Sequence, residues 1–194
     1  MRVLTLGAAL LLSASTAFAA AQHQHGSGHG GGHSAGHGGK HGASGGEQPY
    51  AGLESRAIKA LAPSEVEDLR QGNGMGMALP AELNGYPGPR HVLDLAEELN
   101  LTRHQRHVTE QAFAQMKNQA EALGEQVIAA EQRLDALFAD GQATEVLVTE
   151  ASAHAAALRG ELRAVHLSYH LQMKALLSAN QVERYNHLRG YSSH

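Results

Sequence analysis

Apolar residues recur every three or four positions through the second half of the chain. One such stripe extends from residue 113 to residue 137, and another from residue 147 to residue 176. This period places apolar side chains on one face of an α-helix, so each stripe predicts one long helix. The two stripes consist of Phe113, Met116, Ala120, Leu123, Val127, Ala130, Leu134 and Leu137, and of Leu147, Ala151, His154, Leu158, Leu162, Val165, Tyr169, Met173 and Leu176.

Capping signals predict where these helices begin and end. In the segment 101–105, Leu-Thr-Arg-His-Gln, Thr102 and Gln105 form a T-x-x-Q capping box ahead of the first long helix. Asp140-Gly141 ends that helix, and Thr144 caps the return helix. The segment 177–181, Leu-Ser-Ala-Asn-Gln, repeats the leucine and capping box and begins a last short helix.

The predicted fold is all-α, with a long antiparallel helical hairpin as its main element. Each long helix has roughly 35 residues and spans about 50 Å. Two such helices offer each other little apolar surface, so we expect short flanking helices and a second copy, in a homodimer, to cover the rest. We assign the hairpin domain to residues 91–191.

The start of the chain has the pattern of an export signal. A positive charge at Arg2 precedes an apolar run and the small-residue site Ala17-Phe18-Ala19, which predicts a cleaved signal peptide over residues 1–19. No cysteine follows for a lipid anchor, so we expect a soluble periplasmic protein. Residues 20–49 are rich in Gly and His and have no large apolar side chain before residue 50, which predicts a disordered tail.

Residues 50–90 have a weaker pattern and are predicted to be partly ordered. Short helical spacings between residues 53 and 69 lead into a loop of glycine and methionine, residues 72–77, and a turn cluster follows at residues 84–89. Met75 and Met77 could hold Cu(I), but they are more typical of apolar anchors in such a loop.

The amino-acid composition restricts the metal ligands, the partners and the reactions that the chain can have. The chain has no cysteine, so its metal ligands must be imidazole, carboxylate or thioether, a set that suits Zn, Ni or Cu(II). The net charge is −4 with histidine neutral, which disfavours nucleic acid as a partner. No nucleophile elbow, metalloprotease or kinase signature occurs, so we expect neither an enzyme nor an organic cofactor.

Histidines in the tail are the strongest candidate metal ligands. The last five of them stand four residues apart, but the glycines between them disfavour a helix. A flexible chelator that gathers several neutral imidazoles on one ion fits this composition better, with a solubilising linker as the alternative. The candidates are His23, His25, His29, His33, His37 and His41.

Four further candidates lie on the predicted hairpin. His166 and His170, at i and i+4, can present two imidazoles on one helix face, and His104 and His107 begin the facing helix. A site shared between the two pairs is one possibility, and surface histidines that bind nothing is the other. His154 lies on the apolar stripe, where a core or interface position is more common than a ligand.

The two L-[ST]-x-x-Q segments, 101–105 and 177–181, flank a long helical hairpin behind a signal peptide. In these features the chain resembles the Spy/CpxP-like periplasmic proteins, including their zinc-associated and heavy-metal-resistance branches. The resemblance covers about half of the chain and implies a curved all-α dimer that acts in envelope stress or metal homeostasis.

Three functions remain open at this point. The first is a periplasmic buffer or sensor of divalent transition metals. The second is an ATP-independent holdase chaperone that binds unfolded periplasmic proteins. The third is a module that controls a membrane-bound sensor. The tail histidines favour the first.

Overall fold

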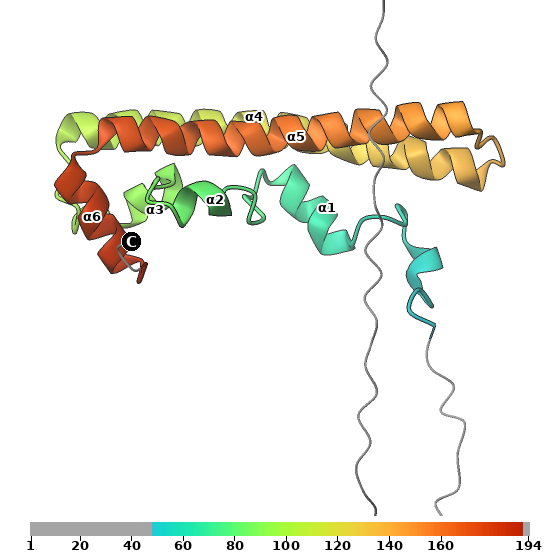
Figure 1. Ribbon diagram of the computed structural model, residues 1–194, viewed down its shortest axis with the longest axis horizontal. Coiled ribbons are helices and arrows are strands. Elements are labelled where there is room, and N and C mark those ends of the chain that lie inside the picture. The colour runs from blue at the N-terminus through green and yellow to red at the C-terminus, as the bar shows by residue number, and fades with distance from the viewer. Residues whose placement is uncertain (1–47, 192–194) are drawn as a thin grey trace, which may run out of the picture. The chain divides into compact units, whose positions relative to one another are not determined.

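A computed structural model describes residues 48–191 of the chain, and in this part helix is the only regular structure (Figure 1). The prediction of an all-α fold is confirmed. No helix in residues 48–191 is long and apolar enough to cross a membrane. In chain order the elements are η1 (Leu53–Ser55), α1 (Pro63–Arg70), α2 (Leu79–Glu82), α3 (Pro89–Asp94), α4 (Arg103–Ala139), α5 (Glu145–Leu176) and α6 (Ala179–Leu188).

The two long helices, α4 and α5, pack along each other in opposite directions (Figure 1). The chain reverses between them over residues 140–144. Gly141 has a φ of 66°, in the left-handed region where glycine pays no side-chain penalty, which ends α4 where the sequence predicts it.

All three predicted caps are formed. Thr102 accepts a hydrogen bond from the backbone N–H of Gln105 ahead of α4, and Ser178 accepts one from that of Gln181 ahead of α6. In both boxes the glutamine side chain returns a bond to the capping residue's N–H. Thr144 accepts from the N–H of Leu147 and begins α5. Each cap satisfies amides that the first helical turn leaves free.

From Ile58 onward, the segment 50–90 packs against the long helices. Helix α1 contacts α4, α2 contacts α5, and α3 contacts both long helices (Figure 1). The close approach of α1 depends on Gly124 in α4, because a Cβ there would lie 2.0 Å from the carbonyl oxygen of Leu69. Met77 packs against the core, as predicted for an apolar anchor, whereas the Met75 side chain is 38% exposed.

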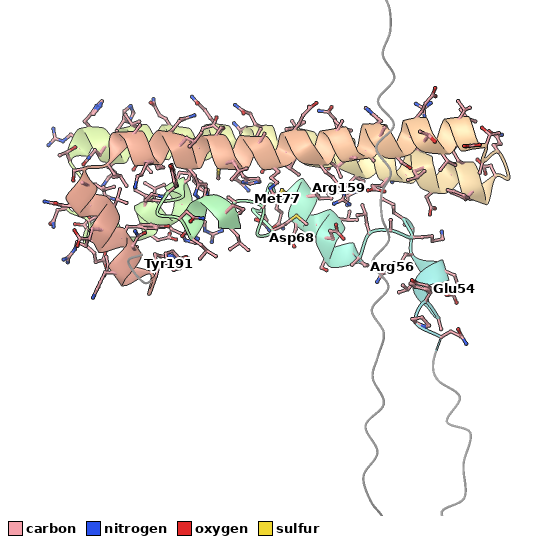
Figure 2. All side chains as sticks on the ribbon, viewed as in Figure 1. Glu54, Arg56, Asp68, Met77, Arg159 and Tyr191 are labelled. Atoms are coloured by element: carbon pink, nitrogen blue, oxygen red, sulfur yellow. The ribbon has the colours of Figure 1, made fainter. Side chains whose placement is uncertain are left out.

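The core has two apolar clusters along the long helices. The first lies where α1 covers them, and the second lies where α3 and α6 do. Beside the first cluster, Arg159 of α5 donates hydrogen bonds to Glu65 of α1 and Glu131 of α4 and so links the three helices (Figure 2). The clusters consist of Ile58, Leu61, Leu69, Ala120, Val127, Ile128, Ala130, Ala155, Leu158 and Leu162, and of Val92, Leu99, Ala112, Met116, Tyr169, Met173, Leu177, Val182 and Tyr185.

Two positions of the predicted α5 stripe, Leu147 and His154, are exposed. The sequence favours a core or interface position for His154. Its side chain is exposed on the single chain, so the core position is wrong, and Ala155 is buried instead. Farther along α5, His166 and His170 are buried. His166 and His170 are buried because α2 and α3 cover their part of α5. Helical periodicity alone does not determine which face of a helix its neighbours cover.

Candidate functional site

Two of the predicted histidine ligands are buried together, one turn apart on α5. His166 is 3% exposed and His170 is 8% exposed. The Nδ1 atom of His170 lies 2.7 Å from the carbonyl oxygen of Tyr86. Because a carbonyl only accepts hydrogen bonds, Nδ1 carries the proton, and in the neutral ring the lone pair is on Nε2.

Gly88 provides the space for the His170 ring. A Cβ at Gly88 would lie 2.9 Å from both Cε1 and Nε2 of that ring, and 3.6 Å from the Oε2 atom of Glu82. No larger residue fits there without moving the imidazole. The His170 ring and Oε2 of Glu82 therefore border the same small space, and Oε2 lies 3.7 Å from Nδ1 of the ring.

Glu82, the last residue of α2, is the functional candidate that sequence reasoning missed. Its side chain is buried, and its Oε1 atom accepts hydrogen bonds from the hydroxyls of Tyr185 at 2.6 Å and Tyr191 at 3.0 Å. Arg189 Nε lies 3.5 Å from the same oxygen. Figure 2 shows Tyr191 just beyond α6. The one sequence signal is an acidic residue between apolar neighbours, Ala81 and Leu83, which is too common to identify a site.

Two buried polar atoms at this place have no hydrogen-bond partner within the described residues: Oε2 of Glu82 and Nε2 of His166. A buried group without a partner costs about 1–3 kcal/mol, so such groups often mark a place for a ligand or an ion. Both residues, with His170, line a cavity of about 660 Å³. Its wall also includes Met116, Arg189 and Tyr191.

Burial shifts the pKa of His166 and the pKa of Tyr185 in opposite directions. Desolvation by burial, followed by the nearby charge of His170, lowers the pKa of His166. His166 is therefore neutral at neutral pH, the form in which imidazole binds metals. Burial, with the hydrogen bond to Glu82 and its charge, raises the pKa of Tyr185, which stays a hydroxyl donor to the carboxylate.

The donor types fit a transition-metal ion, but their present positions do not yet converge. Two imidazoles and a carboxylate are ligands that Zn, Ni and Cu(II) accept. Within residues 48–191, however, no three His, Asp or Glu side chains stand close enough to hold an ion as they are arranged. An ion at this place would require these side chains to move closer together.

The other pair of predicted ligands is separate. His104 and His107 lie exposed in the first two turns of α4, and neither lines the cavity that contains His166 and His170. His104 and His107 are exposed because a different face of α4 points into the core at this end of the helix, the face that carries the fully buried Thr109. The structure thus brings His166 and His170 together, but it does not bring this pair together with His104 and His107.

The predicted tail ligands, His23, His25, His29, His33, His37 and His41, lie outside the described residues, as does the predicted signal peptide. Comparison with protein-family models, with curated proteins and with solved structures finds no significant match to this chain.

Proposed function

We propose that this protein is a periplasmic metal-binding protein that buffers or senses divalent transition-metal ions, Zn, Ni or Cu(II). One observation carries the proposal for the folded part: Oε2 of Glu82 and Nε2 of His166 are buried without partners beside His170, on the wall of one cavity. A cation there would satisfy both atoms. The histidine composition of the tail supports the same function independently.

In this proposal the two parts of the chain have different tasks. The six tail histidines collect ions with little selectivity, because a flexible chelator imposes no geometry and follows the general affinity order of the metals. The folded site is the more selective of the two, because α5 fixes His166 and His170 about one turn apart and so limits the geometry that an ion can have there. Release from the tail and capture by the folded site would give tolerance to changing metal levels.

The contacts of His170 and Glu82 are of the kind that orient metal ligands. A backbone carbonyl, that of Tyr86, accepts from Nδ1 of His170 and leaves Nε2 available. Metal-binding histidines usually have such a partner on the second nitrogen. Tyr185 and Tyr191 hold Oε1 of Glu82 and leave Oε2 available in the same way.

A calorimetric titration with Zn, Ni and Cu(II) tests this proposal. The intact protein is compared with a variant in which the six tail histidines are glutamine, and with that variant carrying H166Q and H170Q. We expect the tail changes to remove most of the stoichiometry and the added changes to remove the remaining ion. H104Q with H107Q, an exposed pair on the neighbouring helix, is the matched control and should leave the ion bound. No binding by the intact protein would refute the proposal.

A specific observation favours one alternative, the holdase chaperone. Leu79, the first residue of α2, and Leu83, the residue after α2, are 52% and 53% exposed, and exposed apolar side chains can bind unfolded clients. The test is suppression of aggregation of an unrelated denatured protein with chelator present. The chaperone is supported if the protein fully suppresses aggregation in chelator and a variant with L79S and L83S does not. If suppression depends on added metal, the two functions are joined.

The proposed homodimer has support at the α4–α5 turn. Phe138, Val146 and Leu147 are 61%, 65% and 38% exposed there, although such residues are usually covered. Analytical ultracentrifugation of the intact protein and of a variant with F138S and V146S tests whether this end contributes to association. A membrane-bound sensor as partner would be tested by co-purification from the inner membrane.

A further inference from the structure

We infer that Arg189 and a bound metal cation compete for the carboxylate of Glu82, so that metal binding releases the end of the chain that follows α6. This inference rests on the proposed function and concerns the regulation of the same site. It follows from three groups that hold one oxygen of Glu82 and from the difference in charge among them.

The segment after α6 is held on Glu82 by side chains. Tyr191 donates to Oε1 at 3.0 Å, and Arg189 lies 3.5 Å from that oxygen through Nε. Arg189 also donates through Nη2 to the hydroxyl of Tyr191 at 3.2 Å and stacks near its ring. Inside α6, Tyr185 donates to the same Oε1 at 2.6 Å. One carboxylate thus fastens both α6 and the segment 189–191 to α2.

Arg189 is the one charged member of these three groups, and its contact with Oε1 is an ion pair. Its positive charge balances the carboxylate of Glu82, which is almost completely buried. A divalent ion on Oε2 of the same carboxylate brings two further positive charges within a few ångströms. Two cations beside a single buried anion repel each other, because charge near the protein surface is screened less than in bulk water. The neutral hydroxyls of Tyr185 and Tyr191 experience no such repulsion.

Arg189 can leave at little cost. The side chain is 33% exposed, so water can hydrate the guanidinium once it moves outward. Tyr185, by contrast, is fully buried in the second core cluster and stays in place. The release is therefore confined to Arg189 and the segment after α6, which is then held on Glu82 only by the hydrogen bond from Tyr191.

Other charged groups on the cavity wall do not replace Arg189. Arg90, Lys117, His91 and Asp94 line the same cavity. Lys117 pairs with Glu121, and His91 lies 3.5 Å from Asp94. None of the four has a described ion pair with Glu82. His170, whose Nδ1 atom lies 3.7 Å from Oε2 of Glu82, is itself a proposed metal ligand. Among the groups that are not proposed ligands, Arg189 is therefore the cation whose position a metal on Glu82 disturbs first.

Linkage makes the effect reciprocal. If metal weakens the contact between Arg189 and Glu82, that contact weakens metal binding by the same factor. Removal of Arg189 should therefore tighten metal binding. A change at the chain end that reports an occupied site is what a sensor requires and a buffer does not.

The experiment compares Arg189→Gln with Arg184→Gln in the protein whose six tail histidines are glutamine, so that the folded site is measured alone. Arg184 lies in α6, just before the segment that contains Arg189, and donates to the carbonyl of Glu98, not to Glu82, so it controls for the loss of one positive charge. We expect R189Q to bind zinc about tenfold more tightly and R184Q to bind it as the parent does.

A second measurement follows the segment itself in the protein with natural Arg189. Trypsin cleaves after Arg189, and mass spectrometry gives the rate of loss of the last five residues. We expect zinc to speed this cleavage and E82Q to abolish the effect of zinc. Unchanged affinity in R189Q, or cleavage that zinc leaves unchanged, would overturn the inference while the folded metal site stands. If the parent protein binds no zinc at all, the folded site of the proposed function fails, and the inference fails with it.

Discussion

Gln105 and Gln181 donate to each other through their side-chain amides, at 2.9 Å and 3.0 Å, although 76 residues separate them. Each amide oxygen also accepts from the backbone N–H of its own capping residue, Thr102 or Ser178. The capping box before α4 and the capping box after α5 are therefore one hydrogen-bonded unit. It joins the start of α4 to the start of α6.

This unit predicts a coupled loss of stability. Q105A and Q181A should each lower the free energy of unfolding by about 1–3 kcal/mol, because each leaves partly buried partners unsatisfied. In a double-mutant cycle the two losses should not add, with a coupling of about 0.5 kcal/mol or more. Urea unfolding measures both. Q126A is the matched control, since Gln126 bonds only within α4 and is exposed; additive losses would contradict the coupling.

Two helical glycines predict opposite effects of the same substitution. G124A should destabilise the protein by about 1–3 kcal/mol, because the new Cβ would lie 2.0 Å from the carbonyl oxygen of Leu69 and displace α1. G160A should stabilise it by up to about 1 kcal/mol, because no atom lies within 4 Å and alanine favours helix. Thermal unfolding of both variants checks this. Equal effects would show that α1 does not need the close approach at Gly124.

The contact between Gly88 and His170 predicts the behaviour of G88A. The added Cβ would lie 2.9 Å from the ring, so the imidazole must move away from the carbonyl of Tyr86. We expect zinc affinity at the folded site to fall about 10–100-fold, as when an outer partner of a metal ligand is lost. The readout is the zinc titration in the protein with tail glutamines. G74A, with no atom within 4 Å of the new Cβ, should bind as the parent does.

The lowered pKa of His166 predicts a loss of stability in acid. Below about pH 6.5 the imidazole in the unfolded chain takes up a proton, while burial and His170 keep the folded one neutral. The free energy of unfolding in chelator should therefore decrease as the pH falls from about 6.5 to the lowered pKa of the folded state, and this contribution should then level off. Urea unfolding between pH 7 and pH 5 should show a smaller decrease for H166Q. H154Q, at an exposed histidine, should keep the natural decrease.

Much of the helical fold follows from the sequence alone, because the signals are local. The caps at Thr102, Thr144 and Ser178 join groups three residues apart, and the stripes of α4 and α5 follow from the helical period. Gly141 ends α4 by its own backbone freedom. The sequence also determines the i, i+4 spacing of His166 and His170 and the histidine content of the tail.

The site itself is decided by tertiary structure. Glu82 lies 103 residues from Tyr185 and 109 from Tyr191, and no local pattern links residues so far apart. Which histidines are buried depends on the face of α5 that α2 and α3 cover, so His166 is enclosed while His154 stays exposed. Periodicity determines which residues share a helix face. Only the stacking of helices determines what that face meets, because burial is a property of the neighbours and not of the residue.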